Sequence, residues 1–142
     1  MQPLIPKRID AELDNWARYQ IHHGESPIPM QYKEAGWVRY MKRGEETECE
    51  STYVSYDATA GAWIEREVYQ KLPLVCKHVM SAWWLCKHWG VNDLTKRLNA
   101  LVQRKALDVP HGFQFSRYQI EADISYIARK TEAALEIRAR GN

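Results

Sequence analysis

The sequence of 142 residues has no apolar run long enough to serve as a signal peptide or to cross a membrane. We therefore expect a cytoplasmic protein with no membrane partner. Its three cysteines are an odd number in a chain without an export signal, which argues for reduced thiols and against a disulfide framework. Internal repeats and low-complexity tracts are also missing. Hydrophobic residues at 45% and charged residues at 27% are typical of a folded globular protein.

Residue patterns that support catalysis or bind a cofactor are also missing. The sequence shows no ordered serine, histidine and aspartate set, no glycine-rich phosphate loop and no supported pair of carboxylates. Two Cys-Lys-His triplets begin at Cys76 and Cys86. On a helix, positions two apart lie about 200° apart around the axis, so a cysteine and its own histidine point away from a shared zinc ion. We expect no enzyme activity, no cofactor and no metal, and we interpret these residues as buried thiols and surface or interface histidines.

Hydrophobic periodicity predicts a mainly α-helical fold. Apolar residues three and four apart, separated by breakers, indicate helices over 10–23, 57–72, 74–89, 93–105 and 116–138. Asp10 and Asn92 are the predicted N-caps of the first and fourth helices. Ser116 and Gln119 form a predicted capping box at the start of the last helix. Pro73 ends the second helix, because its ring removes a backbone donor.

Residues 24–56 interrupt this helical pattern. Prolines, glycines and the acidic run 45–50 break the periodicity, although several aromatic residues distinguish the segment from a disordered tract. We predict a partly irregular arm. The chain then divides into an N-terminal helix with an extended arm, 1–56, and a helical nucleic-acid-binding domain, 57–142, although one core could serve the whole chain.

Charge is distributed unevenly along the chain. Residues 1–73 contain 9 Lys and Arg against 12 Asp and Glu, whereas residues 74–142 contain 11 against 6. The second half is therefore basic and the first half acidic. A mildly basic half joined to an acidic one favours contact of the basic half with phosphate groups, and we expect the C-terminal half to bind nucleic acid.

The last two predicted helices follow the plan of a helix-turn-helix, in which the first turn of the second helix contacts base edges. The predicted DNA-binding residues are Lys96, Arg97, Arg104, Lys105, Arg117, Tyr118, Arg129 and Lys130. The first four would contact phosphates, Arg117 and Tyr118 would contact bases, and the last two would contact backbone or a protein. Two helices with basic outer faces also describe many helical proteins. In addition, the connector of about ten residues is longer than the three or four of the compact motif.

Three segments, in order along the chain, carry a wider resemblance. The first is LDNWARY at 13–19. The second is discontinuous and consists of DA at 57–58, WIEREVYQKLP at 63–73 and MSAWW at 80–84. The third is IEADISYIARKTEAAL at 120–135. Together they resemble the Q-type late-gene transcription antitermination proteins of bacteriophages, in the branch whose helix-turn-helix is similar to region 4 of the sigma factor. The resemblance spans most of the chain and implies a small helical domain that contains a helix-turn-helix-like pair.

This resemblance implies a regulator that binds promoter-proximal double-stranded DNA, engages bacterial RNA polymerase holoenzyme and travels with it through terminators. Such a protein occupies the RNA exit region, so nascent RNA is a further candidate partner. Because exposed aromatic residues often anchor interfaces, the polymerase-binding candidates are Trp37, Tyr40, Tyr53 and Tyr56. These four residues could instead simply cover the helical core. Two other functions stay open: a helix-turn-helix factor that acts only at its promoter, and a helical phage protein that binds only a host protein.

Overall fold

The computed structural model describes residues 5–23, 56–85 and 90–141, and within these ranges the protein is helical and contains no strand. Its elements are α1 (Lys7–His23), α4 (Ala58–Glu67), the 3-10 turn η1 (Tyr69–Lys71), α5 (Leu74–Leu85), α6 (Gly90–Gln103) and α7 (Arg117–Gly141). The predicted mainly α-helical class is confirmed. The predicted irregular arm lies outside the described residues for nearly all of its length. None of the described helices is long and apolar enough to span a bilayer.

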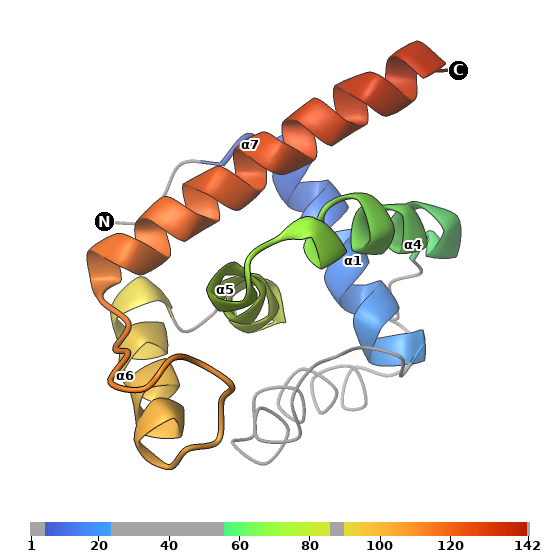
Figure 1. Ribbon diagram of the computed structural model, residues 1–142. Helices are drawn as coiled ribbons and strands as arrows, with labels where there is room; N and C mark the ends of the chain where they lie inside the picture. Colours follow the sequence, from blue (N-terminus) through green and yellow to red (C-terminus); the bar gives the residue numbers. More distant parts are fainter. Residues whose placement is uncertain (1–4, 24–55, 86–89, 142) are drawn as a thin grey trace.

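The helices pack around α5. In Figure 1, α1 and α4 lie on one side of α5, α6 lies on the other, and the long α7 crosses over all of them. α7 contacts α5, α6 and α1. One hydrophobic core includes residues of every helix, and its largest fully buried side chains include Trp16, Trp84 and Met80. α1 therefore packs into the same core as the helices that follow residue 57.

Two buried tryptophans connect α1 to its neighbours through carboxylates. Trp16 of α1 donates its indole N–H to Glu65 Oε1 of α4 over 2.9 Å, and the Gln20 side chain donates to the same oxygen. Trp84 of α5 donates to Asp10 Oδ1 of α1 over 3.0 Å. A buried indole N–H needs a partner, because losing water without a replacement hydrogen bond is costly. These bonds therefore fix how α1 sits on α4 and α5.

The starts of α1 and α6 differ from the predicted N-caps. α1 begins at Lys7, where Pro6 supplies the first helical acceptor to the Asp10 N–H over 2.9 Å. Proline suits the start of a helix, because the backbone N–H that it lacks would have no acceptor within the helix there. Asp10 therefore lies in the first turn and contacts Trp84 instead of capping. α6 likewise begins at Gly90, two residues before the predicted cap at Asn92.

The predicted helix over 57–72 is shorter than its periodicity indicates. The α-helix ends at Glu67, and the chain tightens into η1 before Pro73. This tightening places Tyr69 in the core, where its ring centre lies 5.1 Å from that of Trp16. The Tyr69 hydroxyl shares a hydrogen bond with Ser81 Oγ over 3.3 Å. The predicted last turn of this helix is thus a 3-10 turn that packs the Tyr69 ring in the core.

α1 and α4 approach each other closely at Gly61. A Cβ atom built on Gly61 would lie 2.5 Å from the Cβ atom of Tyr19, well inside van der Waals contact. Both atoms sit close to backbone, so neither can move away by a change of rotamer. The separation between these two helices therefore requires glycine at this position.

Gly61→Ala is expected to destabilise the protein by about 1–3 kcal/mol, because the added methyl forces α1 and α4 apart. The measurement is urea denaturation followed by circular dichroism. Gly141→Ala is the matched control, since a Cβ there meets nothing within 4 Å. Equal stability of the wild type and the Gly61 variant would show that the helices are not packed as described.

Candidate nucleic-acid interface

The outer side of α6 presents two of the predicted DNA-binding residues. The helix buries Val91, Leu94, Leu98 and Leu101 on its inner side. Lys96 is exposed and forms no ion pair in the described part of the chain, whereas Arg97 Nε pairs with Asp93 Oδ2 over 3.3 Å. That pair is substantially exposed, so it contributes little to stability. Of the two α6 cations, Lys96 is therefore the one that forms no ion pair with another described residue.

Two more cations follow directly at the end of α6. Arg104 and Lys105 are exposed, and positive charge at a helix C-terminus is stabilised by the helix dipole. The Ala106 N–H donates to the Leu101 carbonyl and the Lys105 N–H to the Val102 carbonyl, each over 2.9 Å. This is the Schellman arrangement, in which the residue that reverses the chain is usually glycine. Here Lys105 occupies that position with φ at 57°.

Residues 104–116, called the connector below, fold back along α6. The Asn99 side chain of α6 makes two hydrogen bonds to the Phe115 backbone: Nδ2 donates to the carbonyl over 2.9 Å, and Oδ1 accepts from the N–H over 2.7 Å. Phe115 is buried. In Figure 1 the orange connector passes the far end of α6 and returns to the start of α7 near its other end. α6 and α7 therefore meet through a long returning loop and not through the tight turn of a compact helix-turn-helix.

A third hydrogen bond attaches the connector to α5. His78 of α5 is buried, which corrects the prediction of a surface or interface histidine, and its Nε2 atom lies 3.4 Å from the Asp108 carbonyl oxygen. Burial lowers the pKa of His78, because the charged ring would lose its hydration, although the Asp108 carbonyl opposes this effect. The connector is thus tied to the body of the protein at both Asp108 and Phe115.

The two predicted base-contacting residues in the first turn of α7 differ in their exposure to solvent. Tyr118 is 73% exposed, whereas Arg117 is half-buried and its guanidinium carbon lies 5.2 Å from the centre of the Tyr118 ring. Ser116 Oγ accepts from the Gln119 N–H over 3.1 Å, so the predicted cap is confirmed. The Gln119 side chain turns forward to Asp123 Oδ1 over 3.0 Å, and only half of the capping box forms.

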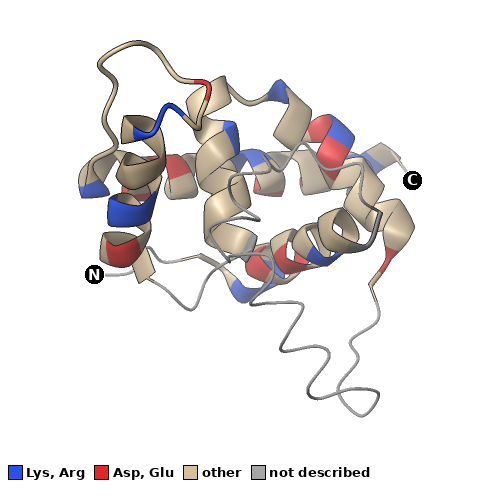
Figure 2. Ribbon diagram, turned by 90° about the horizontal axis from the view of Figure 1, so that it is seen from below, with Lys and Arg blue, Asp and Glu red and all other residues tan. Residues whose placement is uncertain are grey.

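The two remaining predicted residues lie further along α7. Arg129 and Lys130 are exposed, but they lie about 18 Å along α7 from its first turn at 1.5 Å per residue. Lys130 Nζ sits 5.5 Å from the Tyr126 ring centre. Figure 2 shows Lys and Arg on α6 and the connector at one end of the molecule, and further Lys and Arg on the other helices. The outer side of α6, the connector and the first turn of α7 are called the basic face below, and Arg129 and Lys130 lie beyond it.

The predicted polymerase-binding residues are not brought together by the described structure. Trp37, Tyr40 and Tyr53 lie outside the described residues. Tyr56 is half-buried just before α4, at the opposite end of the fold from α6. A common surface for the four residues stays a prediction.

The buried polar residues of α5 and α7 do not form a reactive centre. Burial raises the pKa of the Cys76 thiol to about 12, with the nearby Asp123 carboxyl acting in the same direction. Burial also raises the pKa of Asp123. The thiol therefore stays protonated and weakly nucleophilic at neutral pH. Among the residues that the structure describes, no three His, Cys, Asp or Glu side chains are grouped closely enough to hold a metal ion.

Comparisons of the chain with protein-family models, with curated proteins and with solved structures find no match. Inferences about function therefore rest on the geometry of the basic face and on the segments that carry the resemblance. Sequence reasoning missed Asn99 and the reversal at Lys105. An asparagine within a strongly amphipathic helix is a usable signal, because asparagine is disfavoured there unless its amide has a partner.

Asn99→Ala is expected to destabilise the protein by about 1–3 kcal/mol, because the Phe115 N–H and carbonyl would lose their partners in a buried setting. The measurement is thermal and urea unfolding. Gln103→Ala, one turn further along α6 and exposed, should change stability by less than about 0.5 kcal/mol. Matching losses in both variants would mean that the connector does not depend on Asn99.

Acidification is expected to weaken the fold through His78. Because its folded pKa is lowered, the unfolded state takes up a proton at a higher pH, so the stability from the neutral ring is complete above about pH 6.5 and falls below it. Unfolding free energies measured from about pH 7.5 to about pH 5 should decline less steeply in His78→Gln than in the wild type. His111→Gln, an exposed connector variant, should keep the wild-type slope, and an unchanged slope in His78→Gln would contradict this assignment.

Proposed function

We propose that this protein is a phage-type transcription antitermination regulator that binds promoter-proximal DNA through the basic face and engages bacterial RNA polymerase in the host cytoplasm. The observation that carries the proposal is the group of exposed cations, Lys96, Arg104 and Lys105, which α6 and its C-terminal end present. Phosphate contacts from such residues supply affinity and position without reading sequence. The resemblance of three segments to the antitermination family supports the choice of regulator.

Sequence reading is assigned to the first turn of α7. Tyr118 projects into solvent and Arg117 lies against its ring, so the pair forms a semi-rigid unit beside the capped helix N-terminus. A guanidinium can bond two acceptors on a guanine edge, whereas a lysine such as Lys96 contacts phosphates of any sequence. The regulator acts without covalent chemistry. It remains on the polymerase and blocks the space in which a terminator hairpin would form.

Lys96→Ala is expected to weaken duplex DNA binding for all sequences alike and to lower the slope of log affinity against log salt by about 1. Arg117→Ala should instead reduce the preference for the specific site. The measurement is fluorescence anisotropy over a salt series. Lys71→Ala is the matched control, because that lysine is exposed on η1 and pairs with Glu67 over 3.1 Å. Equal effects of the Lys96 and Arg117 variants on specificity would contradict this division of roles.

A transcription assay with a strong terminator downstream separates antitermination from promoter-restricted action. Terminator readthrough should rise when the protein is present and fall in the Lys96→Ala variant. Intact promoter binding without readthrough would leave a helix-turn-helix factor that acts only at its promoter.

A second candidate, a helical phage protein that binds only a host protein, is favoured by one observation. Ile137 is 66% exposed beside a groove of about 240 Å³ between α4, η1 and α7, lined by Trp63, Ala133 and Ala134 among others. Exposed apolar residues next to a groove are typical of protein-binding surfaces. Absence of DNA binding at low salt would favour this candidate over the first.

A further inference from the structure

The basic face contains a hollow whose amide and aromatic side chains take no part in the proposed contacts to duplex phosphates. It has a volume of about 500 Å³ and lies between the C-terminal half of α6 and the connector. Its floor is apolar and includes Val102, Leu107 and Val109. This size lies within the range of pockets that hold small organic groups. The hollow therefore offers room for a planar group that carries polar edges.

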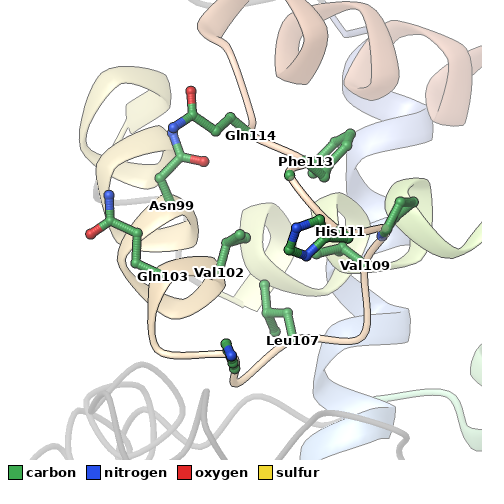
Figure 3. Close-up of a pocket in the computed structure, with 11 residues that line it drawn as sticks. Asn99, Val102, Gln103, Leu107, Val109, His111, Phe113 and Gln114 are labelled. Atoms are coloured by element: carbon green, nitrogen blue, oxygen red, sulfur yellow. The ribbon is translucent and has the colours of Figure 1, made fainter.

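The two sides of the hollow differ in chemistry. Figure 3 shows the amides of Asn99, Gln103 and Gln114 on one side and the rings of His111 and Phe113 on the other. Gln103 and Gln114 are exposed, and neither side chain hydrogen bonds to the described part of the chain. Each amide can both donate and accept. The amides of Gln103 and Gln114 could hydrogen bond to the edge of a flat group that has donors and acceptors there, while the rings of His111 and Phe113 contact its surface.

The Phe113 ring is held in a fixed orientation. Its centre lies 4.9 Å from that of Phe115 at an interplanar angle of 87°, an edge-to-face contact. Phe115 is itself buried and bonded through its backbone to Asn99. A ring that is fixed before binding loses little entropy when a ligand stacks on it. The same two bonds occupy the Asn99 amide, which leaves Gln103 and Gln114 as the amides that are open to a ligand.

Lys105 lies on the rim of the hollow in an unfavourable backbone conformation. Its φ of 57° is in the left-handed region, where glycine is the usual residue at a helix end of this kind. The lysine side chain lines the hollow beside the exposed Arg104. Lysine at this position places a positive charge beside the hollow, which glycine would not supply.

We propose that the hollow takes one unpaired nucleobase of a single strand, with adjacent phosphates contacting Arg104 and Lys105. Proteins read unpaired bases by stacking them on aromatic rings and by bonding their Watson–Crick edges. In a duplex those edges are already paired, so the occupant is a single strand. This inference rests on the proposed function, since it assigns a second form of nucleic acid to the same basic face.

The test compares two probes, a labelled single-stranded RNA of mixed sequence and a labelled DNA duplex, each titrated with the full-length protein at low salt. The double variant Gln103→Ala with Gln114→Ala should bind the single strand at least about tenfold more weakly, a loss of about 1.4 kcal/mol. Its affinity for the duplex should stay within a factor of about two. Gln70→Ala, an exposed glutamine on η1, should change neither affinity.

Lys105→Gly provides a variant whose result cannot be attributed to unfolding, because glycine suits the left-handed conformation better than lysine does. It should melt at the wild-type temperature or above and still bind the single strand more weakly. If the double amide variant and Lys105→Gly both bind the single strand as the wild type does, the hollow does not bind a nucleobase. The proposed function would still hold if the duplex is bound. If these variants lose single-strand binding and the wild type does not bind the duplex, the result supports nucleobase binding in the hollow. It contradicts the proposal that the protein binds duplex DNA.

Discussion

The amide of Asn99 determines the geometry of the proposed interface. Its two hydrogen bonds to the Phe115 backbone return the connector along α6. These bonds attach the C-terminal end of the connector, just before α7, to α6. The same bonds set where α7 begins, hold the edge-to-face pair of rings and close the hollow beside Lys105. The amide thus links the start of α7, with Arg117, to the helix that carries Lys96.

The rest of the fold gives that face a firm support. Trp16 and Trp84 fill the core while their N–H groups bond to carboxylates on neighbouring helices, so α1, α4 and α5 form one packed unit. α7 lies across this unit and carries its first turn out to α6. These two tryptophans therefore help to fix the helices that support the basic face. The inner side of α6 and Phe115 of the connector belong to the same core.

Periodicity predicted the order of the described helices, because each buries one apolar side. It also predicted that Lys96, Arg104 and Lys105 point outward, and all three are exposed. It overestimated the second helix, where the packing of Tyr69 in the core replaces the last turn. The hollow could not be predicted from the sequence. It depends on a tertiary bond between Asn99 and a distant backbone, and local patterns do not reveal such pairs. Neither could they reveal that Arg117 folds against Tyr118.

The most direct test of the account is an NMR titration of the ¹⁵N-labelled protein with nucleic acid at low salt. If the basic face binds, chemical shifts should change in α6, in the connector 104–116 and in the first turn of α7. The backbone signal of Phe115 should be among them, because the connector is anchored there. Shifts confined to α1 and α4, or no shifts at any salt concentration, would contradict the assignment of nucleic-acid binding to this face.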